Sequence, residues 1–180
     1  MLLTESYKAQ NKLLHSAGGY GVKGHSYAER IIALCRAVGS MDVLDYGCGQ
    51  HSMQKSLPFK IREYDPCVDG FDATPEPADI VSCTDVLEHI EPECLDAVLD
   101  DLKRVTRKLG FFTVDIRPAR KFLSDGRNAH LIQEPAEWWF PKLFARFGSV
   151  QIGDILFNSE TEPGLIKVLG FVAIVSNPRA

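Results

Sequence analysis

The sequence predicts an α/β protein with a doubly wound, mostly parallel β-sheet, helices on both faces and an antiparallel hairpin at the C-terminal end. Three observations predict this class. Strand-like apolar segments alternate with helical segments between residues 42 and 147, which is typical of a parallel sheet covered by helices. A glycine-rich loop follows the first of these strands. The last two apolar segments, 150–157 and 166–175, are joined by a short polar connection, which predicts antiparallel neighbours.

Residues 1–40 are expected to form a helical cap ahead of the sheet. Residues 2–15 are compatible with a helix, whereas residues 16–26 contain four glycines in eleven positions and predict a loop. Residues 26–38 place apolar side chains at helical spacing, and Ser26 is the predicted N-cap of that helix.

Residues 41–180 are expected to form the core of a single domain, 1–180, because no repeat or linker divides the chain. A clear amphipathic helix begins at Pro92, with apolar side chains on one face from Leu95 to Val105. A further helix is predicted over 135–147, where Pro141 is expected to kink or divide it. Apart from the terminal hairpin, the predicted strands are 42–46, 60–65, 78–86 and 110–116.

The composition excludes several classes of protein. With 180 residues, 45% hydrophobic residues and a net charge of -4, the chain is a globular protein without a general attraction to nucleic acid. It contains no uninterrupted apolar run of about 18 residues, which predicts no membrane span. No signal peptide is evident, and the five cysteines include no CxxC pair, which argues against disulfides and a structural zinc site. We therefore expect a cytoplasmic protein; its oligomeric state is not indicated.

The glycine-rich loop lies in "VLDYGCGQHS". Gly47 and Gly49 follow Asp45 at the end of the strand, and glycines allow a ligand to approach the main chain closely. Ligands of open parallel sheets bind beyond the carboxyl ends of the strands. A third glycine is absent, and Gln50 and His51 follow instead. Taken alone, the loop leaves a nicotinamide cofactor, a methyl-donor cofactor and a simple turn open.

Acids also close the next two predicted strands. Asp65 lies twenty positions after Asp45, where an acid can accept hydrogen bonds from both hydroxyls of a ribose. Thr84 and Asp85 follow the third strand, in "CTDVLEHIEPE". Because the carboxyl ends of parallel strands meet at one edge of the sheet, these side chains are expected to lie close to the glycine loop.

Together, "VLDYGCG", "EYDP", "DAT" at 72–74 and "ADIVSCTDVLEHI" resemble the class I S-adenosylmethionine-dependent methyltransferases, a Rossmann-like family. The resemblance covers residues 41–116 and implies methyl transfer with S-adenosyl-L-methionine as cofactor. It places one group of residues at the methionine end of the cofactor: Asp45, Gly47, Cys48 and Gly49. It places a second group at the adenosine end: Asp65 on the ribose hydroxyls, Pro66 beside the adenine, and Asp72 and Ala73 near the adenine amino group. It places Thr84 and Asp85 near the sulfonium, and Tyr20, in "YGVKG", in a segment that covers the cofactor.

Two departures from the family pattern bear on this prediction. The third glycine of the loop is missing. In addition, only thirteen residues, 66–78, run from the residue after Asp65 to the first residue of the next predicted strand, "ADIV". That distance is too short for the usual strand and helix, so either the sheet has one strand fewer or "GFDA" forms a short one. A nicotinamide enzyme fits less well, since it normally has three glycines and a longer chain.

The acceptor side of the site is indicated more weakly. His89 and His130 are candidate catalytic bases, because histidine accepts a proton near neutral pH, although His89 is also suited to local packing. Residues 117–130 contain four basic residues and one acid, an excess of +3. This segment is either a solvated loop or one that attracts an anionic acceptor: a small phosphorylated molecule, a nucleotide or a nucleic acid. Trp138 and Trp139 are candidates for an aromatic platform or for the core.

Two alternatives to ordinary methyl transfer stay open. "DVLEH" with a later histidine is similar to the metal-binding pattern of small-RNA 2′-O-methyltransferases, which would make Asp85, Glu88, His89 and His130 a metal shell. The same motif occurs in methyltransferases without a metal, so no metal ligand is assigned. The other alternative is a catalytically inactive binding or scaffold protein that retains the cofactor fold.

Overall fold

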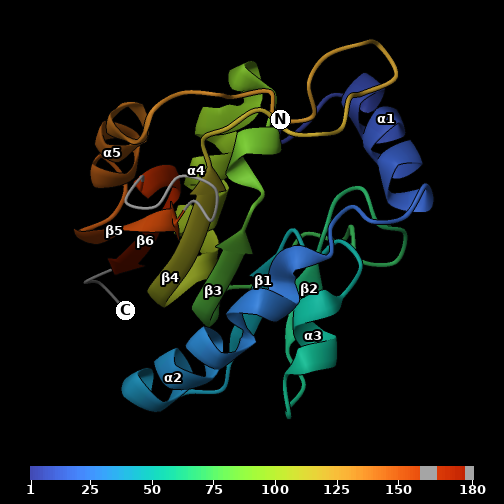
Figure 1. Ribbon diagram of the computed structural model, residues 1–180. Helices are drawn as coiled ribbons and strands as arrows, with labels where there is room; N and C mark the ends of the chain where they lie inside the picture. The colour runs from blue at the N-terminus through green and yellow to red at the C-terminus, as the bar shows by residue number, and fades with distance from the viewer. Residues whose placement is uncertain (159–165, 177–180) are drawn as a thin grey trace.

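The computed structural model describes residues 1–158 and 166–176 (Figure 1). Six strands form one sheet in the order β2-β1-β3-β4-β6-β5. The strands are β1 (Val43–Tyr46), β2 (Arg62–Tyr64), β3 (Ala78–Thr84), β4 (Thr106–Asp115), β5 (Ser149–Asn158) and β6 (Ile166–Ser176). The first four are parallel, and β6 is antiparallel to both β4 and β5. The predicted fold class and terminal hairpin are thus confirmed; most of the polar connection predicted between β5 and β6 lies outside the described residues.

Helices cover both faces of the sheet, as predicted. The helices are α1 (Glu5–Ser16), α2 (Ala28–Val38), α3 (Ser52–Ser56), α4 (Leu95–Val105) and α5 (Ala136–Phe144), with 3₁₀ turns η1 (Lys23–Tyr27), η2 (Leu87–His89) and η3 (Pro92–Cys94). Helices α4 and α5 pack on one face of the sheet and α2 and α3 on the other (Figure 1). Among the helices of the described residues, none combines the length and the apolar character that crossing a bilayer requires.

One local prediction was wrong, and another was wrong in one of its two alternatives. Ser26 is not an N-cap, because residues Lys23–Tyr27 form a 3₁₀ turn that runs directly into α2, and this turn precedes Ala28 without a side-chain cap. Pro141 does not divide α5, which continues to Phe144. The helix loses one backbone hydrogen bond at the proline, and burial of Trp139 and Leu143 in the core holds it together.

The segment between β2 and β3 contains no strand in the described structure. Its backbone turns on itself: Asp65 N donates to Phe71 O at 2.9 Å, and Phe71 N donates to Val68 O at 3.1 Å. Strand β2 pairs with β1 alone and forms an edge of the sheet. Of the two alternatives for this short segment, the sheet with one strand fewer is therefore the correct one.

Candidate functional site

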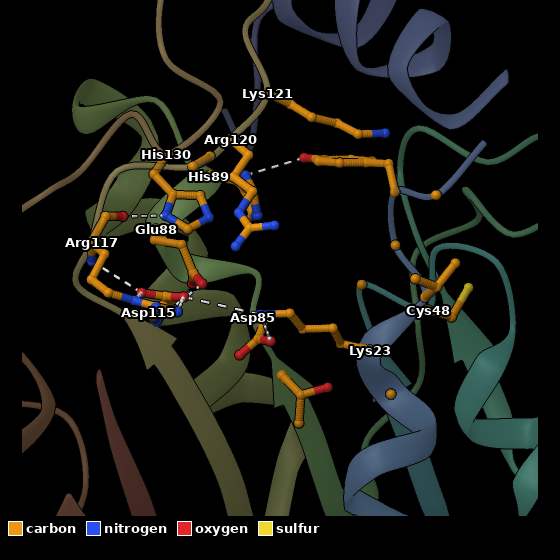
Figure 2. A pocket seen from close by; sticks show the side chains of 18 of the residues that line it. Lys23, Cys48, Asp85, Glu88, His89, Asp115, Arg117, Arg120, Lys121 and His130 are labelled. Carbon is orange, nitrogen blue, oxygen red and sulfur yellow. Dashed lines mark hydrogen bonds and ion pairs between the residues drawn. The ribbon is translucent and has the colours of Figure 1, made fainter. Parts of the chain in front are cut away.

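The carboxyl ends of β1, β3 and β4 enclose a cavity of about 510 Å³, which we call the main cavity (Figure 2). The segment Gly19–Gly24 and the loop 117–121 complete its walls. A second, smaller cavity of about 90 Å³ lies between α1 and the ends of β1 and β2. Both cavities are lined by Tyr20, Gly21, Gly47, Asp85 and His89, so they adjoin one another. Their position is the usual ligand site of an open parallel sheet.

Eleven of the thirteen residues predicted for the site line one or both cavities. They are Tyr20, Asp45, Gly47, Cys48, Gly49, Asp65, Pro66, Thr84, Asp85, His89 and His130. The structure does not bring Asp72 and Ala73 to either cavity, and the Asp72 side chain, which is 43% exposed, forms an ion pair with Lys8 at 3.5 Å. The adenine role of these two residues stays a prediction. Trp138 and Trp139 also lie away from both cavities, and Trp139 belongs to the core.

The two glycines of the loop are required by close packing. Both have positive φ, 88° at Gly47 and 49° at Gly49. A Cβ atom on Gly47 would lie 2.4 Å from Val86 Cγ2, and one on Gly49 would lie 2.7 Å from the carbonyl oxygen of Gly21. The loop is also tied to the end of β2, because Gly49 N donates to Asp65 Oδ2 at 3.1 Å. A side chain at position 47 would therefore displace Val86, and one at position 49 would displace the segment that contains Gly21.

His51 takes the place of the missing third glycine, and it does so in a left-handed conformation with φ of 59°. This conformation costs a residue other than glycine about 1–2 kcal/mol. Two side-chain contacts compensate: His51 Nδ1 lies 3.0 Å from Glu63 Oε1, and its ring packs on Phe71 with a centroid separation of 4.4 Å. The loop therefore keeps, at His51, the left-handed backbone that the missing glycine would adopt.

Two carboxylates flank the glycine loop. Asp45 is buried, and burial, followed by the charge of Glu63, raises its pKa from 3.8 to about 7. Asp65 is also buried, and its second oxygen, Oδ1, accepts a hydrogen bond from Cys67 N at 2.8 Å. A cationic ligand near Asp45 would compensate for the solvent interactions that this carboxylate loses on burial, and would favour its charged form.

Asp85 is held in a strained backbone conformation with φ of 54°. Thr113 Oγ1 donates to Asp85 Oδ1 at 2.8 Å, and the amide of Asp85 donates to Thr113 Oγ1 at 3.0 Å. Lys23 Nζ lies 3.3 Å from the other carboxylate oxygen. Strained residues that neighbours hold in place are concentrated at functional sites. No sequence signal identifies Thr113, because its contact with Asp85 is made between β4 and the end of the paired strand β3.

His89 and His130 lie edge to face, with ring centroids 4.7 Å apart. Burial, followed by the proximity of His130, lowers the pKa of His89 to about 3. Nδ1 of His89 lies 2.7 Å from Ala129 O, and Nδ1 of His130 lies 2.5 Å from Arg117 O. Because a carbonyl oxygen only accepts hydrogen bonds, each Nδ1 carries a proton. In the neutral ring of His89 this leaves Nε2 with a free lone pair.

The side chain of Glu88 lies beside those of the two histidines. It is fully buried, its Oε1 accepts from Asp115 N at 3.0 Å, and its Oε2 has no partner among the described residues. Burial, followed by the charge of Asp85, raises the pKa of this carboxyl well above 4.5. Glu88, His89 and His130 each offer a ligand atom within 4.8 Å of the other two.

Four basic side chains line the main cavity together with four acidic ones (Figure 2): Lys23, Arg117, Arg120 and Lys121 beside Asp45, Asp85, Glu88 and Asp115. Arg117 Nη2 pairs with Asp115 Oδ2 at 2.6 Å, and Lys121 Nζ donates to Gly18 O at 2.7 Å. Arg120 lines the cavity without an ion pair or hydrogen bond to any described residue. Sequence reasoning missed Lys23 and Asp115; the position of Asp115 at the end of β4 is the same signal that identified the other strand-end acids.

Solved structures with the same architecture are methyltransferases. The methyltransferase domain of bacterial CtHen1 matches with a TM-score of 0.57 at 15% identity, over 87% of this chain and 98% of that domain. The N-methyltransferase NodS from Bradyrhizobium japonicum WM9, in complex with S-adenosyl-L-homocysteine, matches with a TM-score of 0.56 at 16% identity, over 86% and 87%. Magnesium protoporphyrin IX methyltransferase from Synechocystis PCC 6803, with bound S-adenosylhomocysteine, gives 0.56 at 14%, over 85% and 82%.

The chain has the fold of class I S-adenosylmethionine-dependent methyltransferases. No family profile and no curated protein matches the sequence. The methyltransferase fold predicted from residues 41–116 is confirmed, and the matches extend over most of the chain. In this methyltransferase fold the main cavity lies at the carboxyl edge of the parallel strands, where the glycine loop and the strand-end acids meet.

Proposed function

We propose that this protein is an S-adenosylmethionine-dependent methyltransferase. The observation that carries the proposal is the pair of adjoining cavities, which brings the glycine loop and Asp45, Asp65 and Asp85 into one site. The fold shared with solved methyltransferases supports the same conclusion. Three acids at successive strand ends suit a cofactor that carries an ammonium group, a sulfonium and ribose hydroxyls.

The residues that line the two cavities carry the groups that such a cofactor requires. In this proposal Asp45, Gly47, Cys48 and Gly49 hold the methionine end. Asp65 binds the ribose with Pro66 beside the adenine, while Thr84 and Asp85 lie near the sulfonium and Tyr20 covers it. When bound, the cofactor supplies a methyl group on a positively charged sulfur, an activated leaving group. The protein then has to position the acceptor and exclude water.

We infer that the acceptor is anionic. Lys23, Arg117, Arg120 and Lys121 line the main cavity, and Arg120 alone among these four has no ion pair or hydrogen bond with the described residues. An unpaired guanidinium in a cavity suits a carboxylate or phosphate. A pKa of about 3 makes His89 a weak base, so its Nε2 orients the acceptor, and His130 removes the proton where the acceptor atom carries one.

Calorimetric titration with S-adenosylmethionine and S-adenosylhomocysteine tests the cofactor. Asp65→Ala is expected to weaken binding at least about tenfold, because it removes a hydrogen-bonded carboxylate. Asp69→Ala is the matched control, since Asp69 is 87% exposed and pairs with Lys12 instead. Failure of the wild-type protein to bind either compound would contradict the proposal. Binding without turnover against broad acceptor pools would identify an inactive scaffold.

A second candidate is metal-assisted methyl transfer to a ribose 2′-hydroxyl of RNA. The specific observation is the set Glu88, His89 and His130, in which Glu88 Oε2 is buried without a partner among the described residues. Nδ1–H bonds to carbonyl oxygens orient both histidines, as is common for metal ligands. Methylation that persists after EDTA treatment excludes this candidate, whereas loss and recovery with an added divalent ion supports it.

A further inference from the structure

Three potential metal ligands come together at the glycine loop, two from the loop itself and one from β2. Cys48, His51 and Glu63, which we call the loop cluster, each offer a ligand atom within 4.8 Å of the other two. His51 Nδ1 is already 3.0 Å from Glu63 Oε1. Figure 2 shows Cys48 on the opposite side of the main cavity from His130, so the loop cluster is separate from Glu88, His89 and His130.

The three side chains have little freedom to move apart. Cys48 is 4% exposed, and its amide donates to Tyr64 O at 3.1 Å, which ties it to β2. Glu63 lies in β2 itself, paired with Asp45 of β1. Cys48 is buried, whereas the side chains of His51 and Glu63 are 27% and 10% exposed, so these two provide a route of entry from solvent. The cluster is therefore rigid, nearly enclosed and open on one side.

A thiolate, an imidazole and a carboxylate form a ligand set that Zn²⁺ prefers, with a fourth position left for water. Bonds of about 2.0–2.3 Å to a tetrahedral zinc place its ligand atoms about 3–4 Å apart. His51 and Glu63 already meet this distance, and the cysteine sulfur requires a shift of about 1 Å at most. We propose that the loop cluster binds a thiophilic divalent cation of the zinc class.

The charges around the cluster favour a cation. Asp45 and Asp65 lie near Cys48 in addition to Glu63, so three carboxyl groups surround the sulfur atom. A bound divalent ion would convert the thiol into a thiolate ligand and offset the carboxylate charges.

The same proposal accounts for the left-handed histidine. A glycine at position 51 would adopt φ of 59° without strain, yet it would provide no ligand. His51 keeps the loop conformation and places a ring nitrogen beside Glu63. This inference does not rest on methyltransferase activity, because ion binding is measured on the protein without cofactor or acceptor.

Titration of the metal-free protein with Co²⁺ under anaerobic, reducing conditions tests the site. A thiolate-to-cobalt charge-transfer band in the near ultraviolet is expected, saturating at one ion and disappearing when Zn²⁺ is added. Cys48→Ser should abolish this band. His51→Gly, which retains the preferred backbone conformation, should weaken binding by at least about tenfold. Glu63→Gln should weaken it to a similar extent.

Two controls separate this site from its alternatives. His89→Ala should leave the band unchanged, because the cluster of Glu88, His89 and His130 contains no sulfur. Cys94→Ala, at a buried cysteine outside the cluster, should also leave it unchanged. The proposal is overturned if the wild-type protein shows no thiolate band, if the band survives Cys48→Ser, or if a correctly folded His51→Gly protein binds Co²⁺ as tightly as wild type.

Discussion

At the scale of single residues, the role proposed for Asp45 in cofactor binding has a consequence for stability. Its pKa is raised from 3.8 to about 7, so between about pH 4 and pH 7 the folded protein retains a proton that the unfolded chain has released. The free energy of unfolding therefore falls as pH rises through this window. The charged carboxylate that an ammonium group would bind is the main form above about pH 7. Asp45 therefore destabilises the folded protein most in the pH range in which it would bind a cation best.

Asp45→Asn is expected to stabilise the protein at pH 8 relative to wild type and to have little effect at pH 5. Each kcal/mol recovered should raise the Tm by about 2–4 °C. The same variant should bind S-adenosylmethionine more weakly, and the affinity of the wild-type protein should rise between pH 6 and pH 8. Thermal unfolding and calorimetry at the two pH values measure both effects. Asp69→Asn, at an exposed position, is the control. If Asp45→Asn raised the Tm equally at pH 5 and pH 8, the raised pKa of Asp45 would be refuted.

His51 offers a second residue-scale prediction. Both His51→Ala and His51→Gly remove the contacts with Glu63 and Phe71, but only alanine keeps the cost of the left-handed backbone. Urea unfolding should therefore find the alanine variant less stable than the glycine variant by about 1 kcal/mol. Equal stabilities would show that the loop changes its conformation when the histidine is lost.

At the scale of elements, the segment before α2 forms a cover over the glycine loop. Gly21 O accepts a hydrogen bond from Gln50 N at 2.9 Å, and Gly21 is in contact with Gly49. Helix α1 contributes Tyr7, Asn11 and His15 to the second cavity, whose 90 Å³ is small compared with the pockets of about 300–1,000 Å³ that hold typical ligands. We expect α1 and its glycine-rich connection to move when an adenosine group binds.

Gly21→Ala tests this cover. Its Cβ atom would lie 2.9 Å from His15 Cε1 and 3.1 Å from Gly49 Cα, so the variant should bind S-adenosylmethionine at least about tenfold more weakly. Gly18→Ala is the matched control, because Gly18 also has positive φ but nothing within 4 Å of an added Cβ atom. In the wild-type protein, the hydrogen-exchange rates of the α1 amides should change when the cofactor binds. If Gly21→Ala and Gly18→Ala bound the cofactor equally well, this would argue against a closing segment.

Most elements could be predicted because burial imposes a period on the sequence. Leu95, Val98, Leu99, Leu102 and Val105 are all buried, as the helical spacing of α4 requires. The start of β4 at Thr106 was not predictable, since Arg107 and Lys108 point to solvent and the strand follows α4 without a loop. The acids of the site were predictable from strand ends, whereas contacts between a loop and a strand, such as that of His51 with Glu63 in β2, depend on how the elements pack together.

At the scale of the whole molecule, a net charge of -4 coexists with a basic rim around the main cavity. This separation should make the site attract small anions although the protein as a whole repels them. Inorganic phosphate is expected to raise the Tm of the wild-type protein more than that of Arg120→Ala, with the difference disappearing at high salt. Arg127→Ala is the control, because Arg127 pairs with Asp125 and lines neither cavity. Identical phosphate responses in all three proteins would remove the argument for an anionic acceptor.

The position of β6 has a consequence for how the chain folds. This strand lies between β4 and β5, although both precede it in the sequence. Until residues 166–176 have been synthesised, β4 can pair with β3 alone and its other edge stays open. The sheet can therefore be completed only in a late step that inserts a strand between two earlier ones. Such closure is non-local, and a growing chain on the ribosome carries an exposed strand edge beside the main cavity until that step occurs.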